Sequence, residues 1–380
     1  MLPTNKRMRI SPMAVIRATL PYIRSFFVSR FMIVASVLAC LLVFEFAFNF
    51  MIHFNSTSGM SMYLRGFLMK QKTNISGNSL RHLLTGRPNR DSSDDKPRLP
   101  LCPLIPSNLE GPVKVDKNVY SNRNIEAMNS AVKAGGRWWP DTCTSRHHVA
   151  IIIPFRDRPS HLKIFMTNIH HFLQRQELDY GIFVVEPVSD VKFNRAMLFN
   201  IGYAEAIKQH NYTCFIFHDV DLIPEDDRNL YTCPEMPRHM SVAIDKLKYK
   251  LPYTQIFGGV SALTQEQFIQ VNGFSNKYFG WGGEDDDMFN RIHSENFNIM
   301  RYSSEVARYK MLSHAKDEPN PQRHKLLKGS ESRYKTDGLN SLKYAVLRIE
   351  LRKLYTWILV DINEKEVMQD TGPDKKNMKS

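Results

Sequence analysis

The stretch Cys214–Ile223 reads CFIFHDVDLI, an apolar run that passes into two acids one residue apart, Asp219 and Asp221. A short apolar run rich in aromatic and β-branched residues is typical of a buried strand. Ligands of open α/β sheets bind at the carboxyl ends of the strands, where paired acids can help to hold a divalent cation against a nucleotide diphosphate. The same pair also fits an ordinary solvated turn, so this stretch alone does not distinguish the two.

Two other apolar runs repeat the pattern. VAIIIPF occupies residues 149–155 and closes at Pro154, and GIFVVEPV occupies residues 181–188. Between the runs lie stretches with the apolar spacing of helices, HLKIFMTNIHHFLQRQ and FNRAMLFNIGYAEAIKQ. This alternation predicts an α/β domain with a mostly parallel sheet. Neither a GxxxxGKS/T loop nor a GxGxxG turn is present, which argues against a kinase, a P-loop ATPase or a dinucleotide oxidoreductase.

A second polar cluster, GWGGEDDD, occupies residues 280–287 and combines glycines, a tryptophan and four successive acids. Acids are favoured in the first turn of a helix, and DDDMFNRI has the composition of one. A helix start requires neither the glycines nor Trp281, however. Glycines beside a large aromatic suit a loop that closes over a sugar, and a neighbouring carboxylate can serve as a general base.

The segment MLSH, Met311–His314, opens a long polar stretch that has the composition of a loop. Taken alone, His314 reads as a surface histidine, and a thioether such as that of Met311 is not an expected ligand for a hard cation. Long loops in compact domains are usually functional or disordered, so the segment stays a candidate.

Near the amino terminus, Phe31–Ile52 is an apolar run of 22 residues in which only Glu45 is ionisable. A helix needs about 20 such residues to cross a bilayer. Basic residues and no acids precede the run, which by the positive-inside rule keeps residues 1–30 cytosolic. We therefore expect a cytosolic tail (1–30), a transmembrane signal anchor (31–53), a flexible polar stem (54–100), a luminal catalytic domain (101–362) and a disordered tail (363–380).

The net charge of +13 is concentrated at the amino terminus, because residues 1–100 hold 14 Lys or Arg against four acids. This leaves the rest of the chain nearly balanced and removes the main argument for a nucleic-acid partner. Four of the five cysteines follow the apolar run, an even number that suits two disulfides in an oxidising compartment. Sequons at Asn55, Asn74 and Asn211 are predicted glycosylation sites on the same side of the membrane.

Six motifs in order closely resemble the β-1,4-galactosyltransferase family of inverting enzymes with the GT-A fold. They are FNRA (193–196), FHDVDLIP (217–224), FGGVSAL (257–263), NGFSNKYFGWGGEDDD (272–287), MLSH (311–314) and EPNPQR (318–323). The resemblance extends over roughly residues 102–361. It implies a Rossmann-like, mostly parallel sheet and a metal-dependent transfer of a sugar from a UDP-sugar in the Golgi.

Carried over position by position, the resemblance implies a role for each matching residue. The expected base is Asp285, and the expected Mn²⁺ ligands are Asp221, Met311 and His314. The expected donor-binding residues are Pro154, Phe155, Arg156, Arg158, Phe193, Arg195, Asp219, Val220, Ile256, Trp281 and Glu284. The expected acceptor-binding residues are Tyr253, Asp286, Arg323 and His324. The family's disulfides would join Cys102 with Cys143 and Cys214 with Cys233.

Two departures from the family pattern bear on specificity. Ile256 stands where vertebrate members have tyrosine, and a smaller aliphatic residue there resembles the invertebrate N-acetylgalactosaminyltransferases. His324 stands where many members have phenylalanine. We therefore expect a β-1,4-N-acetylgalactosaminyltransferase that uses UDP-GalNAc and a GlcNAc-terminated glycolipid or glycoprotein. The alternatives are the same reaction with UDP-galactose and an inactive luminal lectin-like relative, and a modifying partner protein stays an open question.

Overall fold

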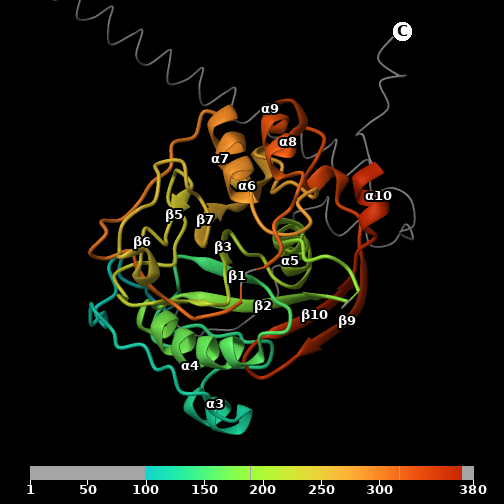
Figure 1. Ribbon diagram of the computed structural model, residues 1–380. Coiled ribbons are helices and arrows are strands. Elements are labelled where there is room, and N and C mark those ends of the chain that lie inside the picture. The colour runs from blue at the N-terminus through green and yellow to red at the C-terminus, as the bar shows by residue number, and fades with distance from the viewer. Residues whose placement is uncertain (1–98, 189, 316, 370–380) are drawn as a thin grey trace, which may run out of the picture. The chain divides into compact units, whose positions relative to one another are not determined.

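The computed structural model describes residues 99–188, 190–315 and 317–369. Within these ranges a seven-stranded sheet has the order β5-β7-β3-β1-β2-β10-β9 (Figure 1). The neighbours β3, β1, β2 and β10 run parallel, β7 is antiparallel to both β3 and β5, and β9 is antiparallel to β10. The strands are β1 (His148–Pro154), β2 (Asp179–Pro187), β3 (Cys214–His218), β5 (Arg238–His239), β7 (Val260–Thr264), β9 (Ala345–Leu351) and β10 (Thr356–Asp361).

A three-stranded second sheet, in the order β4-β8-β6, follows the carboxyl end of β3. It consists of β4 (Leu222–Pro224), β6 (Ala243–Ile244) and β8 (Arg308–Met311). The stretch CFIFHDVDLI is therefore not one strand. Strand β3 ends at His218, the acids occupy a turn, and Leu222 begins β4 in the other sheet.

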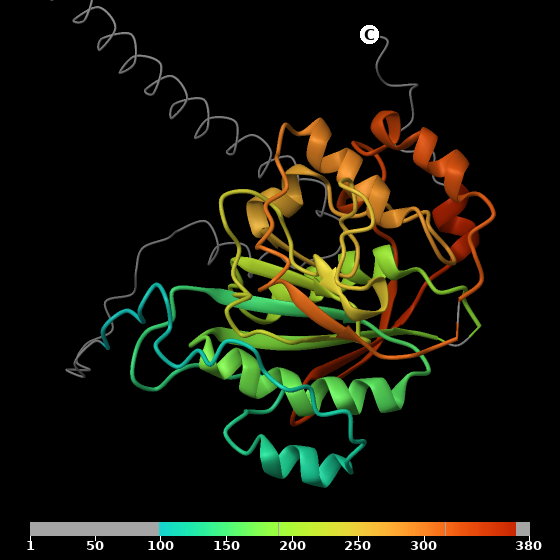
Figure 2. The same ribbon diagram turned by 60° about the vertical axis from the view of Figure 1, so that its left-hand side comes forward.

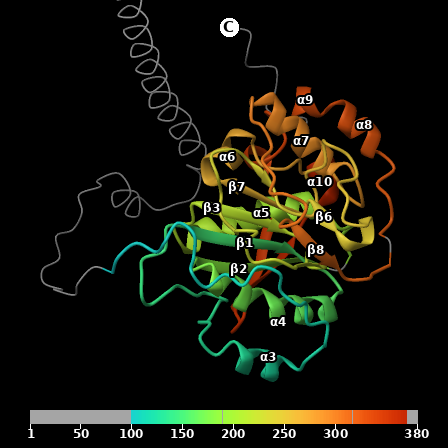
Figure 3. The ribbon, with the colours of Figure 1, turned by 90° about the vertical axis from the view of Figure 1, so that its left-hand side faces the viewer.

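Helices cover both faces of the large sheet, and β1 shows why. Val149, Ile151 and Ile153 pack in one buried cluster with α4, while Ala150 and Ile152 pack in a second cluster with α5. Figures 2 and 3 show α3 and α4 on one side of the sheet and α5, α6 and α7 on the other. The helices are α3 (Asn122–Met128), α4 (Pro159–Arg175), α5 (Arg195–Gln209), α6 (Gln265–Gln270), α7 (Glu284–Ser294), α8 (Arg323–Lys328), α9 (Ser330–Arg333) and α10 (Glu364–Gln369), with 3₁₀ turns at Asp245–Leu247 and Leu339–Ser341.

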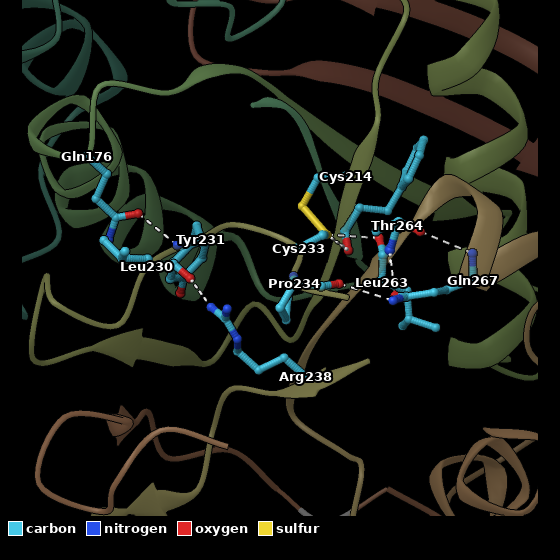
Figure 4. The surroundings of a disulfide bond; sticks show 11 residues. Gln176, Cys214, Leu230, Tyr231, Cys233, Pro234, Arg238, Leu263, Thr264 and Gln267 are labelled. Atoms are coloured by element: carbon cyan, nitrogen blue, oxygen red, sulfur yellow. Dashed lines mark hydrogen bonds between the residues drawn. A yellow bond between two sulfur atoms is a disulfide. The ribbon is translucent and has the colours of Figure 1, made fainter. Parts of the chain in front are cut away.

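The two disulfides join Cys102 to Cys143 and Cys214 to Cys233, which confirms the pairing expected from the family. Figure 4 shows that side chains on both sides of Cys233 also hold its segment in place. Gln176 accepts a hydrogen bond from the backbone N–H of Tyr231, and Gln267 donates to the carbonyl of Pro234. The loop after β4 is thus fixed to the start of β3.

The predicted α/β class and the parallel core of the sheet are confirmed. The predicted tail is wrong over residues 363–369, because α10 forms there and buries Val367 in the cluster that contains α5. In residues 99–369, apart from 189 and 316, no helix is both long and apolar enough to cross a membrane. The predicted anchor (31–53), most of the predicted stem and the sequons at Asn55 and Asn74 lie outside the described residues, whereas Asn211 is exposed just before β3.

Candidate active site

The turn after β3 brings the two acids of the DVD sequence to the carboxyl end of the sheet. The backbone N–H of Asp219 donates to the carbonyl of Gly259, and that of Leu222 donates to the carbonyl of Asp219. His218 lies fully buried behind the turn, with Nδ1 2.8 Å from the carbonyl oxygen of Asp219 and Nε2 2.8 Å from the hydroxyl of Tyr231. Burial lowers the pKa of His218 to about 3, so it is a neutral support of the turn.

Asp221 and His314 meet although they come from separate motifs. Nε2 of His314 lies 3.0 Å from Oδ2 of Asp221. Strand pairing sets this contact, because Leu222 of β4 lies opposite Met311 of β8 and the N–H of Leu312 donates to the carbonyl of Asp221. The three expected metal-binding positions therefore lie around one short stretch of sheet.

The donor set of this pair fits a divalent cation of the manganese type. Burial and the neighbouring Asp219 raise the pKa of Asp221 to about 6, while His314 opposes them. A buried carboxylate that is destabilised by a second carboxylate gains from a bound cation. Carboxylate and imidazole are suitable ligands for Mn²⁺, and the thioether of Met311 is the soft member of the set.

Arg195, the first residue of α5, connects the DVD turn to the GWGGEDDD segment. Its Nε lies 2.5 Å from Oδ1 of Asp219 and its Nη1 lies 3.5 Å from Oε1 of Glu284. Although burial opposes it, these two carboxylates raise the pKa of Arg195. The second carboxylate oxygen of Glu284 is buried and has no hydrogen-bond partner among the described residues. It is therefore available to a ligand hydroxyl.

Of the four successive acids that begin α7, the first three differ in their surroundings from the fourth, Asp287. Burial, and after it the neighbouring Asp285, raise the pKa of Glu284 to about 7, and burial together with Asp286 raises the pKa of Asp285. Asp286 accepts a hydrogen bond from the hydroxyl of Tyr253 at 2.9 Å. The helix starts after Gly283, whose φ of 95° is costly for other residues.

Asp287, the fourth acid, belongs to the protein interior. It is fully buried, binds Arg291 at 2.6 Å and Arg333 at 2.8 Å, and accepts a hydrogen bond from Tyr278 at 3.0 Å. All four acids lie in the first turn of helix α7, so the prediction of a helix start is correct. For Asp287, a structural role in the interior is a sufficient explanation. Of the other three acids, Glu284 and Asp285 have raised pKa values.

Trp281 is 59% exposed on the loop before α7. Backbone hydrogen bonds join Trp281 to Glu318 and Asn320, which brings the EPNPQR motif beside the loop. The guanidinium of Arg323 lies 5.7 Å from the centre of the indole ring. His324 is the next residue of α8 and is exposed, so an aromatic, cationic surface flanks the acids.

The remaining expected donor residues lie around the ends of β1 and β2. Pro154 ends β1, and the N–H of Phe155 donates to the carbonyl of Val185. The guanidinium of Arg156 lies 5.1 Å from the ring centre of Phe193 and donates to the carbonyl of Val191.

Arg158 approaches the expected metal site directly. Its Nη2 lies 3.3 Å from Nδ1 of His314 and 3.1 Å from Asp317. Val220, one of the expected donor-binding residues, lies between the two acids of the DVD turn and is buried.

Ile256 is half-buried in the loop before β7. Its carbonyl accepts a hydrogen bond from Arg301 at 2.8 Å, and the same guanidinium donates to Nδ1 of His239 at 3.1 Å. Two residues later, Gly258 faces Asp285 so closely that a β-carbon would lie 2.4 Å from its Oδ2. Gly258 and His218 lie inside the motifs FGGVSAL and FHDVDLIP, and only the tertiary structure shows what each of them contacts.

Comparison with known proteins finds two family models and several enzymes that are similar to this chain. Residues 102–234 match the model described as the N-terminal region of glycosyl transferase group 7, and residues 238–315 match that described as the N-terminal domain of galactosyltransferase. The chain is 51% identical to mouse β-1,4-galactosyltransferase 1 over 268 residues, which is 70% of this chain and 67% of the relative. It is 46% identical to mouse β-1,4-galactosyltransferase 4 over 275 residues, 71% of this chain and 80% of the relative.

Among solved structures, the chain is similar to a mutant of Drosophila β-1,4-galactosyltransferase 7 in complex with manganese, UDP-Gal and xylobiose. The sequence identity is 29% and the TM-score is 0.50, and the match covers 57% of this chain and 94% of the other.

Proposed function

The chain belongs to the β-1,4-galactosyltransferase family, and from this premise we propose that it transfers GalNAc from UDP-GalNAc to the 4-hydroxyl of a terminal GlcNAc. The product would be GalNAcβ1-4GlcNAc on a glycolipid or a glycoprotein. One observation carries the catalytic part of the proposal: Arg195 joins Asp219 of the DVD turn to Glu284 of α7. It therefore couples the expected donor side of the site to the helix turn that contains Asp285.

Asp221 and His314, with Met311 beside them, are the residues that would hold Mn²⁺. The ion, when bound, would supply positive charge against the diphosphate leaving group. Arg158 lies within reach of the same group, since its guanidinium already contacts His314. Arg195 and Asp219 would orient the donor, and the free oxygen of Glu284 would accept a hydrogen bond from a sugar hydroxyl.

Asp285 is the proposed general base. In an inverting transfer, one carboxylate takes the proton from the acceptor hydroxyl while the oxygen attacks the anomeric carbon from the face opposite UDP. The raised pKa of Asp285 supports this role, because a base works best when its pKa is close to the working pH. Tyr253 and Asp286, joined by a hydrogen bond, would hold the acceptor together with the exposed Trp281 and Arg323.

The donor assignment rests on Ile256. UDP-GalNAc carries an N-acetyl group at C2 that needs more room than the hydroxyl of UDP-galactose, and isoleucine is shorter than the tyrosine of vertebrate family members. The relatives named above are galactosyltransferases, so UDP-galactose is the direct rival. A catalytically inactive lectin-like protein is the second rival, and the retained base and cation-binding residues argue against it.

One incubation separates the three functions. The full-length chain in detergent is mixed with Mn²⁺, a GlcNAc-terminated acceptor and equal amounts of UDP-GalNAc and UDP-galactose, and the product is weighed by mass spectrometry. We expect the mass of an added N-acetylhexosamine. A galactose product would support the rival donor, and acceptor binding without any product would support the lectin-like protein.

The proposed location is the Golgi membrane, with residues 1–30 cytosolic and the domain from residue 101 luminal. The basic residues before the apolar run and the two disulfides support this orientation. Protection of the domain from protease in intact microsomes, together with glycan on the exposed Asn211, is the expected result.

A further inference from the structure

Three side chains that could bind a metal ion come together at the amino-terminal end of the parallel strands. The DVD turn lies at the other, carboxyl-terminal end. His148 begins β1, Asp179 begins β2, and these two residues are register partners in the sheet. His210 caps the carboxyl end of α5, which packs on the same strands. Asp219 and Asp221 follow the carboxyl end of β3, which is parallel to β1, so this group lies at the opposite end of the strands from the DVD turn.

The backbone fixes the position of all three residues. The carbonyl of His148 accepts from the N–H of Thr213, and the N–H of Asp179 donates to the carbonyl of His147. The N–H of His210 donates to Ala206 in the last turn of α5. The side chains therefore converge from rigid elements rather than from a mobile loop, as a metal site requires.

Their distances are close to those of a tetrahedral site. Nδ1 of His148 lies 2.9 Å and Nε2 of His210 lies 3.7 Å from the same oxygen of Asp179, Oδ2. One ligand atom from each residue lies within 4.8 Å of the other two. Zinc–nitrogen and zinc–oxygen bonds of about 2.1 Å place neighbouring ligands about 3.4 Å apart, between the two distances seen here.

The arrangement is not explained by an ion pair alone. Arg137 already binds the other oxygen of Asp179, Oδ1, at 2.9 Å, so that carboxylate has a counter-ion. Nε2 of His210 is buried and has no hydrogen-bond partner among the described residues, although it faces Asp179.

We propose that His148, Asp179 and His210 form a second divalent-metal site, of the zinc type, separate from the site of sugar transfer. Two imidazoles and one carboxylate are ligands that zinc accepts, and water would complete the coordination because both histidine side chains are more than one third exposed. Arg137 would orient the carboxylate through its second oxygen, as outer-shell partners commonly do. The bound ion would join the starts of β1 and β2 to the end of α5.

Zinc titration of the full-length, chelator-treated chain tests this site without reference to sugar transfer. Isothermal titration calorimetry with ZnCl₂ would compare wild type, Asp221→Asn, the double variant H148Q/H210Q, and the matched control H171Q/H293Q, whose two histidines are exposed elsewhere. Because the Asp221–His314 pair can also take zinc, we expect wild type and the control to bind one more zinc ion than H148Q/H210Q, and Asp221→Asn to keep the site that H148Q/H210Q lacks. Zinc should raise the melting temperature of wild type, Asp221→Asn and the control more than that of H148Q/H210Q.

Equal zinc stoichiometry and affinity in H148Q/H210Q and wild type would overturn the proposal, as would absence of saturable binding to wild type. Should the double variant fail to fold, the single variant His210→Gln, changed at a partly exposed helix end, takes its place. Manganese-dependent transfer by H148Q/H210Q should stay at the wild-type level. Failure of the transferase assignment would leave the zinc result unaffected.

Discussion

Gly258 leaves room for the carboxylate of Asp285, since a β-carbon at position 258 would lie 2.4 Å from Oδ2 of Asp285. Only the absence of a side chain permits this approach. We expect Gly258→Ala to fold and to bind the donor, but to displace the carboxylate by about an ångström. Such a displacement can reduce kcat by about 100-fold. Steady-state kinetics check this, and an unchanged kcat would mean that the position of this carboxylate does not matter.

Replacement of the proposed base, Asp285, should act on the chemical step. Asp285→Asn keeps the shape of the side chain and removes the proton acceptor, so kcat should fall by roughly 10²- to 10⁴-fold while the KM for the donor changes little. The control is Asp287→Asn, which breaks the buried contacts to Arg291 and Arg333 and should reduce stability. A large rise in donor KM at constant kcat would assign Asp285 to binding instead.

Part of the fold can be predicted from the sequence, and part depends on contacts between distant segments. The apolar runs of β1, β2 and β3 and the helices α4 and α5 have local periodicities, and the sequence predicts them with boundaries only a few residues off. The small sheet could not be predicted in this way. Its strands have two to four residues, and their pairing depends on contacts between distant segments.

The four acids of GEDDD show the same limit within the site. Their spacing is uniform, and the sequence predicts a helix start and a cluster of carboxylates equally well. Only the packing separates Asp287, which faces Arg291 and Arg333, from Asp286, which faces Tyr253. Helix α10 cannot be predicted from the sequence because its polar residues show no apolar period; only its adjacent residues Val367 and Met368 pack against the core.

Removal of either side chain of the proposed cation site, Asp221 or His314, should abolish metal-dependent transfer. Asp221→Ala and His314→Ala each delete half of the 3.0 Å contact at the DVD turn, whereas the backbone pairing of β4 with β8 remains. We expect no Mn²⁺-stimulated activity and a circular dichroism spectrum close to that of wild type. Full activity of either variant in the presence of a chelator would contradict the assignment.

The stability of the domain should fall in acid because of buried neutral histidines. His170 is fully buried, with its ring nitrogens near the hydroxyl of Tyr180 and the carbonyl of Leu354, and burial lowers its pKa to about 3. The unfolded chain, with a histidine pKa near 6.5, binds more protons below that pH, so the free energy of unfolding decreases as the pH falls.

This one residue should remove about 2 kcal/mol of stability between pH 7 and pH 5. Urea unfolding at several pH values measures the slope, and His170→Gln should make it shallower whatever its stability at pH 7. The exposed His293→Gln is the matched control and should keep the wild-type slope. An identical slope in His170→Gln and wild type would show that His170 does not contribute to acid lability.

The donor preference should change with the size of one side chain. Ile256 is half-buried two residues before Gly258, which lies against the carboxylate of Asp285, and Arg301 fixes its backbone carbonyl. A tyrosine at this position would fill the space that the N-acetyl group of UDP-GalNAc requires. Crowding in a packed site costs about 1 to 3 kcal/mol, which corresponds to a change in preference of roughly ten- to a hundredfold.

We therefore expect wild type to prefer UDP-GalNAc and Ile256→Tyr to prefer UDP-galactose, each measured as the ratio of kcat/KM for the two donors with the same acceptor. Ile256→Val makes the side chain smaller. It is the matched control and should keep the preference for UDP-GalNAc. Because the backbone is held through the carbonyl of residue 256, all three proteins should share the same fold. A wild type that transfers galactose at least as well as N-acetylgalactosamine would refute the donor assignment and leave the family assignment intact.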